Sequence, residues 1–413
     1  MSELLIRDSS AGCVDITGFS AAGVHCDVRG KGDGRLDLAI VVSECPCTVA
    51  GVFTMNRMAA APVQLGRKML VDGDYFKGFV ANSGNANACT GEQGMKDALA
   101  MRERVAAKIG CAPEEIFVCS TGRIGQHLPM GKILSGIDSA VESLSGKGEA
   151  GHGAADAILT SDTCRKVCTV EFQTDSGKGM LAGMAKGAGM IEPNMATMLG
   201  FISTDIALGK EDAQQLLKEC VDGTFNAVTV DGDESTNDTV LLFANGSSGI
   251  FLEPGQPDWE SFKAALKAVC MDLAQKIVGD GEKITKVVEV CIEGAATAED
   301  AQLAARAIAN SLLVKSSWYG NDPNWGRLMD ALGYSGAALS EQSVQLWYLA
   351  SDSTERVPVF SHGTVHHENI GQWKTIVSGS RFTIAIDLGQ GNQGTRVWST
   401  DLTEGYVDFN KSE

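Results

Sequence analysis

Short apolar runs recur along the chain and are separated by glycine-rich turns. Many of these runs contain β-branched and aromatic residues, which is typical of buried β-strands. Glycine is abundant, with 48 residues, and proline is scarce, with 9, so glycine is expected to form most of the turns. The runs that predict strands are 35–43, 76–82, 114–120, 166–173, 239–245, 287–294 and 380–388.

Other segments have the spacing of three and four residues that marks an amphipathic helix. In 258–278, Trp259, Phe262 and Leu266 fall on one face, and Asp258 is suited to cap the helix at its start. Strands and helices alternate throughout, which predicts an α+β (mixed α/β) fold with layered sheets covered by helices. The other predicted helices are 96–109, 211–221 and 299–313.

Composition narrows the classes of function. The chain has 413 residues, 44% of them hydrophobic and 21% charged, which indicates a folded globular protein. Its net charge of −18 argues against nucleic acid and against an anionic membrane surface as partners. No apolar run is long enough to cross a membrane. The start, MSELLIRDSS, lacks the pattern of a secretory signal, so we expect a cytoplasmic protein.

Metal and dinucleotide sites are not expected. The twelve cysteines include no C-x-x-C pair and many lie in apolar stretches, which predicts buried, reduced thiols. The histidines of 362–369 have no accompanying zinc-binding spacing and predict a solvated loop. GQGNQG (389–394) has the letters of a dinucleotide fingerprint, but a strand-like segment follows where a helix is required, so we interpret it as a turn.

The segment GAGMIEPNMATMLGF (187–201) combines a glycine loop, Pro193, and a small Ala196 directly before Thr197, at the start of an apolar strand. If the chain were cut before Thr197, the new α-amine, with a pKa of about 8, would be a base for the threonine hydroxyl. The same hydroxyl could make the cut by attacking the Ala196 carbonyl, which forms an ester that water releases. A plain loop that leads into a buried strand fits these residues as well, so on their own they leave both interpretations open.

The segment AKGAGMIEPNMATML (185–199) closely resembles the cleavage region of the glutamate N-acetyltransferase / ornithine acetyltransferase family of arginine biosynthesis. The resemblance continues, in the family's order, over nearly the whole chain. The other similar segments are VANSGNANACTG (80–91), VCSTGRIG (118–125), ILTSDT (158–163), FNAVTVDGDESTNDTV (225–240), DPNWGR (322–327) and DLTEGYVDFN (401–410).

This resemblance implies an acyltransferase with the ornithine acetyltransferase / DmpA-like fold. Residues 1–196 would form an α chain and 197–413 a β chain, and the two would stay together in an (αβ)₂ heterotetramer. The enzyme would move acetyl from N2-acetyl-L-ornithine to L-glutamate through an acetyl-threonine intermediate. No cofactor or metal is implied, and acetyl-CoA stays open as a second acetyl donor.

The resemblance also implies roles for individual residues. Thr121 and Gly122 match the oxyanion hole, for which a hydroxyl and a backbone N–H are suitable donors. A lysine can bind the carboxylate of an amino-acid substrate, and a glutamate can bind its ammonium group. The cleavage site would be Ala196 and Thr197, with Thr197 as the nucleophile, and the substrate-binding residues would be Thr160, Lys186, Thr197, Glu282 and Asn410.

The chain departs from the family beside one of these residues. The family usually has Gly-Ala after the glutamate matched by Glu282, whereas this chain has Lys283 and Ile284. Because this change affects the expected acceptor pocket, two other classes of function stay open. One is an amidase or aminopeptidase of the same chemistry, in which water replaces the amine acceptor. The other is an uncleaved binding protein on the same scaffold.

The first prediction concerns processing. We expect the purified protein to give two fragments on a denaturing gel, residues 1–196 and 197–413, with the second beginning Thr-Met-Leu-Gly. Thr197→Ala should leave the chain whole because it removes the attacking hydroxyl, whereas Thr197→Ser keeps a hydroxyl and can still cleave. An intact wild-type chain, or a cut at another bond, would contradict the prediction.

Overall fold

The computed structural model describes residues 4–7, 11–192 and 198–411, and it forms two compact units. The first unit comprises Met1–Asn226 and Asp233–Ile277, and the second comprises Ala227–Gly232 and Val278–Glu413. The predicted division into chains at 196/197 is a covalent one. It falls within the first unit and stays a prediction.

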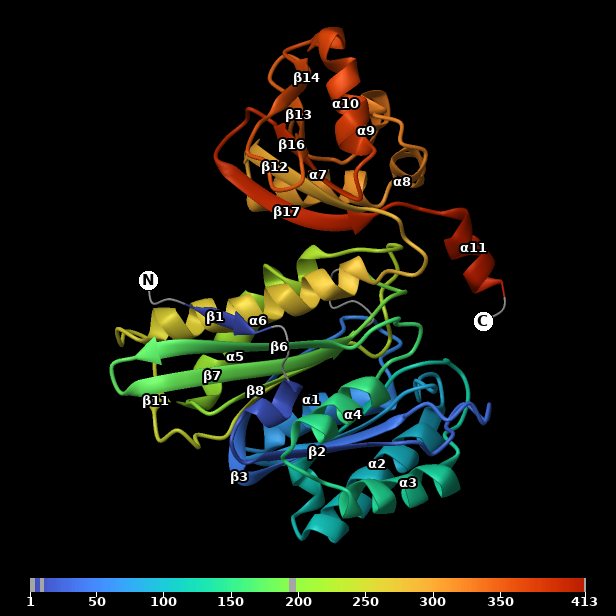
Figure 1. The fold of residues 1–413 in the computed structure, drawn as a ribbon, viewed down its shortest axis with the longest axis vertical. Helices are drawn as coiled ribbons and strands as arrows, with labels where there is room; N and C mark the ends of the chain where they lie inside the picture. Colours follow the sequence, from blue (N-terminus) through green and yellow to red (C-terminus); the bar gives the residue numbers. More distant parts are fainter. Residues whose placement is uncertain (1–3, 8–10, 193–197, 412–413) are drawn as a thin grey trace. The chain divides into compact units, whose positions relative to one another are not determined.

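A nine-stranded sheet forms the centre of the first unit (Figure 1), in the order β1-β6-β7-β8-β10-β3-β4-β5, with β2 also paired to β3. The pairs β8–β10 and β4–β5 are parallel, and the other pairs are antiparallel. A small separate pair joins β9 (Ala207–Leu208) and β11 (Phe251–Leu252). The strands of the large sheet are β1 (Leu5–Arg7), β2 (Phe19–Val24), β3 (Leu38–Phe53), β4 (Phe76–Asn82), β5 (Ile116–Ser120), β6 (Lys166–Thr174), β7 (Gly177–Lys186), β8 (Leu199–Thr204) and β10 (Thr239–Ala244).

This sheet folds over on itself at β3. The first part of β3 pairs with β2 and β4 and its last part pairs with β10, and the register with β4 shifts between Val42 and Cys47, next to Pro46. In a flat sheet β4 and β8 would lie three strand spacings apart, about 14 Å. Yet Phe79 of β4 stacks on Phe201 of β8 with ring centroids 3.8 Å apart. The two parts of the sheet therefore face each other across a shared apolar core.

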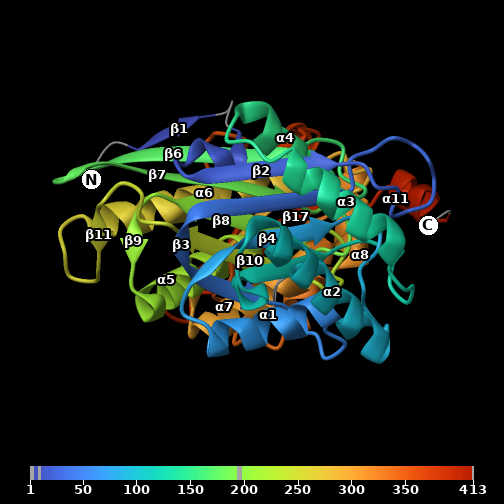
Figure 2. The same ribbon diagram turned by 90° about the horizontal axis from the view of Figure 1, so that it is seen from below.

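Helices cover the outer faces of this unit (Figures 1 and 2). On β7, Gly183 leaves room for α6, because a Cβ at this position would lie 2.8 Å from Leu273 and 3.0 Å from Val269. On β2, a Cβ at Gly23 would lie 2.0 Å from the carbonyl oxygen of Gly153, so the backbone of α4 lies directly on the strand. The helices are α1 (Ala61–Asp72), α2 (Gly91–Ile109), α3 (Met130–Glu142), α4 (Gly148–Ala157), α5 (Lys210–Asp222) and α6 (Trp259–Gly279).

The second unit has a six-stranded sheet in the order β15-β14-β13-β16-β12-β17 and its own apolar core. The neighbouring strands β16 and β12 run parallel, and the other pairs are antiparallel. Its strands are β12 (Val287–Ala295), β13 (Gln345–Ala350), β14 (Val357–Ser361), β15 (Thr364–Val365), β16 (Arg381–Asp387) and β17 (Gln393–Thr400). Its helices are α7 (Ala298–Ala309), α8 (Leu312–Tyr319), α9 (Trp325–Gly333), α10 (Ile370–Val377) and α11 (Glu404–Asn410).

The structure confirms the predicted mixed α/β class, and each predicted strand is present, although β3 extends ten residues beyond the predicted end at residue 43. The prediction of one helix over 299–313 is wrong. The segment divides into α7 and α8 because Ser311 caps α8, its hydroxyl accepting a hydrogen bond from the N–H of Val314. GQGNQG joins β16 to β17, as the turn interpretation requires.

All twelve cysteines are free. Seven of them are buried, which confirms the prediction for that group, and burial raises the pKa of the Cys13 thiol to about 12. The prediction is wrong for Cys45, Cys89 and Cys164, which are exposed. Within the described ranges, no helix is long and apolar enough to span a bilayer.

Candidate active site

Strand ends from both parts of the folded sheet meet in the first unit. Asn237, just before β10, is buried, and its side-chain amide donates to the carbonyl oxygens of Ala86 at 2.6 Å and Ser120 at 2.8 Å. Ser120 in turn donates its hydroxyl to the side-chain oxygen of Asn82 at the end of β4, at 2.7 Å. The start of β10 is thereby tied to the ends of β4 and β5, where the predicted oxyanion hole begins.

Thr121 and Gly122 directly follow β5. Thr121 is 3% exposed and its backbone N–H donates to the carbonyl oxygen of Asn82 at 3.0 Å. Its hydroxyl makes no hydrogen bond to any residue in the part of the chain that the structure describes, so it remains available as a donor. Gly122 has φ +132°, and a Cβ there would lie 2.3 Å from the carbonyl carbon of Gly84. Only glycine fits this close approach, which explains why the sequence has one here.

Lys186, at the end of β7, is 2% exposed and lies in a buried cluster of charges. Asp162 accepts hydrogen bonds at one oxygen from the ammonium of Lys166 and from the N–H of Gly187, both at 2.7 Å. Burial alone would raise the pKa of Asp162, but the charges of Lys186 and Lys166 and these hydrogen bonds outweigh it and hold the pKa at about 2. Asp162 is therefore an anion that compensates two buried lysines.

The same carboxylate organises Thr160. The N–H of Thr160 donates to the second oxygen of Asp162 at 3.0 Å, and its hydroxyl lies 3.5 Å from that oxygen. Two predicted substrate-binding residues, Thr160 and Lys186, are thus brought together around one aspartate. Asp162, Asn237 and Asp238 are not among the predicted site residues. Asn237 and Asp238 lie directly before the buried strand β10, and Asp162 lies four residues before the start of β6.

In the second unit, Glu282 and Asn410 meet. The side-chain amide of Asn410 donates to a carboxylate oxygen of Glu282 at 3.1 Å, so residues 128 positions apart form one pair. Lys283 beside them has φ +57°, in the left-handed region that favours glycine, and its ammonium lies 5.4 Å from the ring centroid of Phe409. Glycine, the family's usual residue at this position, would adopt this backbone conformation without strain.

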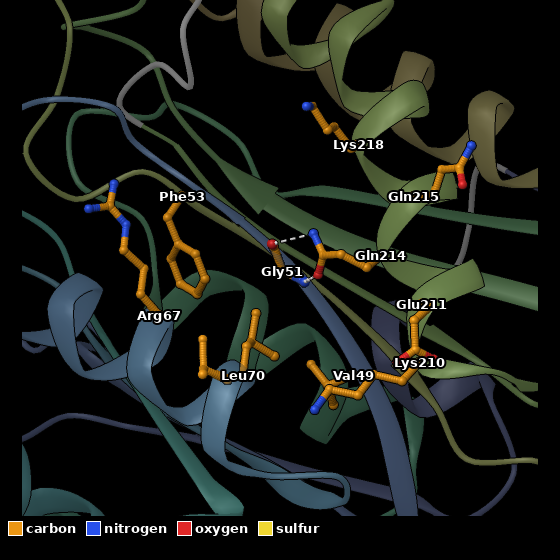
Figure 3. Close-up of a pocket in the computed structure, with 11 residues that line it drawn as sticks. Val49, Gly51, Phe53, Arg67, Leu70, Lys210, Glu211, Gln214, Gln215 and Lys218 are labelled. Atoms are coloured by element: carbon orange, nitrogen blue, oxygen red, sulfur yellow. Dashed lines mark hydrogen bonds between the residues drawn. The ribbon is translucent and has the colours of Figure 1, made fainter.

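The predicted cleavage residues Ala196 and Thr197 lie outside the described residues. A groove of about 690 Å³ opens between α1 and α5 over β3 (Figure 3). Its lining includes apolar Phe53 and Leu70, and Gln214 crosses it with two hydrogen bonds to the backbone of Gly51. None of the predicted site residues that the structure describes lines this groove. In the described ranges, no group of three or more His, Cys, Asp or Glu side chains is placed to hold a metal ion.

Comparison with known proteins identifies the family. The ArgJ family model matches residues 20–412. The chain belongs to the ArgJ family. It is 44% identical to the arginine biosynthesis bifunctional protein ArgJ of Symbiobacterium thermophilum, over 96% of each chain. It is 41% identical to the protein of the same name from Bacillus subtilis, over 96% of this chain and 94% of the relative.

Two further proteins are similar to this chain. A relative from Schizosaccharomyces japonicus, whose name adds "mitochondrial", is 42% identical over 95% of this chain and 92% of its own. The solved ornithine acetyltransferase of Mycobacterium tuberculosis, complexed with ornithine, is 38% identical over 46% of this chain and 98% of that chain, with a TM-score of 0.42. Membership in the ArgJ family confirms the predicted family and the predicted acyltransferase role in arginine biosynthesis.

The second prediction tests the Thr121 hydroxyl. Thr121→Ala should lower kcat by about 10²-fold or more, with a smaller change in KM, because an oxyanion donor acts mainly on charge that develops in the transition state. Thr174→Ala is the matched control, since Thr174 is also buried but donates its hydroxyl to Gly177 at 2.7 Å in a turn. Unchanged turnover in a properly processed Thr121→Ala protein would remove Thr121 from the mechanism.

The third prediction tests the buried anion. Because the folded-state pKa of Asp162 is depressed to about 2, its ionisation stabilises the fold above the ordinary aspartate pKa, and this stabilisation is lost as pH falls toward 2. A depression of this size corresponds to about 2 kcal/mol. Asp162→Asn should therefore lower the free energy of unfolding at pH 6, and the gap to wild type should narrow toward pH 3, as measured by denaturant unfolding. A gap that does not change with pH would contradict this assignment.

Proposed function

We propose that this protein cleaves itself between Ala196 and Thr197 and then transfers acetyl from N2-acetyl-L-ornithine to L-glutamate. The observation that carries the proposal is the ArgJ family match over residues 20–412, with relatives named as bifunctional proteins of arginine biosynthesis. The chemistry also fits the polar ends of β5 and β7, where a candidate oxyanion donor and a buried cation lie within one compact unit.

In the first half of the reaction, the hydroxyl oxygen of Thr197 attacks the acetyl carbonyl carbon of acetyl-ornithine. The α-amine of Thr197 takes the hydroxyl proton as general base. Thr121 and Gly122 donate hydrogen bonds to the oxyanion of the tetrahedral intermediate. The bond between the acetyl carbon and the ornithine nitrogen then breaks, the proton passes to that nitrogen, and ornithine leaves an acetyl ester on Thr197.

In the second half, the amine of glutamate attacks the ester carbonyl. The α-amine of Thr197 accepts a proton from the attacking nitrogen and returns it to the threonine oxygen as the ester bond breaks. The products are N-acetylglutamate and the free enzyme. A bound amine competes with water because well-oriented groups reach effective molarities of about 10⁵–10⁸ M.

Charge at the site favours amino-acid substrates. Lys186 supplies a buried positive charge for a substrate carboxylate, and Asp162 compensates this charge together with that of Lys166. We assign Thr160 to orient the same substrate, and we propose Glu282 and Asn410, which pair within the second unit, as further substrate-binding residues. We further propose that the α and β chains assemble as an (αβ)₂ heterotetramer and that acetyl-CoA serves as a second acetyl donor.

The fourth prediction tests transfer against hydrolysis. With acetyl-ornithine and saturating glutamate, the wild-type enzyme should form N-acetylglutamate in large excess over free acetate. The ratio of these two products is measured after a fixed amount of ornithine has been released. A product mixture dominated by acetate would reject the transferase and favour the amidase alternative.

Lys283→Gly, which restores the family's usual residue, tests whether Lys283 contacts the acceptor. The ammonium of Lys283 lies over Phe409, so removing it should change the KM for glutamate by less than about threefold, while glycine suits the left-handed backbone at this position. Ornithine release without glutamate should continue in this variant. A large rise in the KM for glutamate would show that Lys283 contacts the acceptor.

A further inference from the structure

Arg29 lies in the loop between β2 and β3 and contacts two segments of the candidate active site. Its side chain is half-buried, and one terminal nitrogen of the guanidinium donates to the carbonyl oxygens of Leu159 and Thr160, both at 3.3 Å. Its aliphatic stem lies against Gly84, where a Cβ would be 2.5 Å from Cγ of Arg29. One side chain therefore contacts both the predicted substrate-binding segment and the segment that supports Gly122.

The guanidinium and a neighbouring carboxylate hold the backbone of Thr160 at two points. Its carbonyl oxygen accepts from Arg29, and its N–H donates to Oδ2 of Asp162 at 3.0 Å. The hydroxyl of Thr160 lies 3.5 Å from the same oxygen, at the limit of a hydrogen bond, so it loses little when it turns to another partner. The backbone of Thr160 is thus fixed while its hydroxyl remains free to orient a substrate.

The stem of Arg29 acts on the oxyanion side of the site through Gly84. Gly84 has φ +93°, and its carbonyl oxygen accepts from the N–H of Arg123 at 3.5 Å. A Cβ at Gly122 would lie 2.3 Å from the carbonyl carbon of Gly84, so these two backbones are in contact. Because packed groups transmit displacements, a shift of Gly84 would displace the predicted oxyanion donor beside it.

The buried Asp37 places both Arg29 and Gly84. Its Oδ2 accepts from the N–H of Val28, directly before Arg29, at 2.7 Å. Its carbonyl oxygen accepts from the N–H of Ser83, directly before Gly84, at 2.9 Å. Within the part of the chain that the structure describes, the guanidinium makes no ion pair and no hydrogen bond besides the two to backbone carbonyls. The fixed loop thus directs this side chain to the two segments of the site and to no carboxylate.

We propose that Arg29 is a positioning residue with two separable functions: its guanidinium fixes Thr160, and its stem supports Gly122 through Gly84. This inference rests on the proposed roles of Thr160 in substrate binding and of Gly122 in the oxyanion hole. Arg29 forms and breaks no covalent bond. It sets the position of the residue that orients the acetyl donor relative to the group that stabilises its oxyanion, and catalysis is sensitive to such placement.

The test compares two substitutions that separate these contacts. Arg29→Met keeps an unbranched apolar stem against Gly84 but removes the guanidinium, whereas Arg29→Ala removes both. Arg102→Met is the matched control, because Arg102 is a partly buried arginine of the same unit whose guanidinium also donates at 3.3 Å, to the exposed Glu114. Melting temperature, extent of processing, kcat and KM for acetyl-ornithine are measured for the wild type and each variant.

In processed Arg29→Met we expect KM for acetyl-ornithine to rise about fivefold or more, with kcat within about threefold of wild type, because Thr160 loses an anchor while Gly84 keeps its support. In Arg29→Ala the same rise in KM should accompany a fall in kcat of about tenfold or more, because the oxyanion donor is displaced. Arg102→Met should keep both values whatever its melting temperature. An Arg29→Ala protein that folds but stays uncut also supports the proposal, because the cut passes through an oxyanion of the same kind.

A wild-type KM in Arg29→Met, or equal kcat values in processed Arg29→Met and Arg29→Ala, would overturn the proposal. If Arg29→Ala does not fold, the KM of Arg29→Met decides the question. If neither variant folds, Arg29→Lys decides it. Lysine keeps the stem but lacks the planar fork, so KM should rise about threefold or more at unchanged kcat, and an unchanged KM would overturn the inference. Failure of the proposed function is seen separately in the wild type, as a single uncut chain or as no ornithine release from acetyl-ornithine.

Discussion

The fold of the first unit depends on one strand that belongs to two parts of a sheet. β3 pairs with β2 and β4 through its first half and with β10 through its second, and the irregularity near Pro46 allows the change of direction. Proline suits such an irregularity because it has no N–H for a regular ladder. The stacked Phe79 and Phe201 rings show how closely the two parts approach. Without this folding, the ends of β5 and β10 would be too far apart for Asn237 to bridge them.

The charged groups near these strand ends are buried, and one aspartate compensates two lysines. Lys186 is the predicted substrate-binding cation, and Asp162 ties it to Lys166 through shared charge. A buried lysine without a compensating anion would tend to lose its proton, because burial disfavours the charged form. The aspartate therefore compensates the buried positive charge of this predicted substrate-binding lysine.

At Lys283, the structure changes the interpretation of a difference between this chain and its family. A lysine beside a predicted substrate-binding glutamate looks from the sequence like a new charge in the pocket. In the structure its ammonium lies over Phe409, and its backbone is held in the conformation that the family's glycine would adopt without strain. The substitution thus alters the contact between this turn and α11 more directly than it alters Glu282.

The sequence by itself determined the class of fold, most of the strands and the family. Each of these depends on local pattern: buried strands such as β4 are continuous apolar runs, and the family is carried by contiguous motifs such as STGRIG and DPNWGR. It missed the break at Ser311, because a capping hydroxyl is one residue in an otherwise helical pattern. Tertiary structure alone decided which polar residues share an environment. Asp162 lies 24 residues before Lys186, Asp238 lies 40 residues after Met198, and Asn237 lies 117 residues after Ser120. Their roles arise from burial and from meeting at strand ends, and neither property is encoded in the residues near them along the chain.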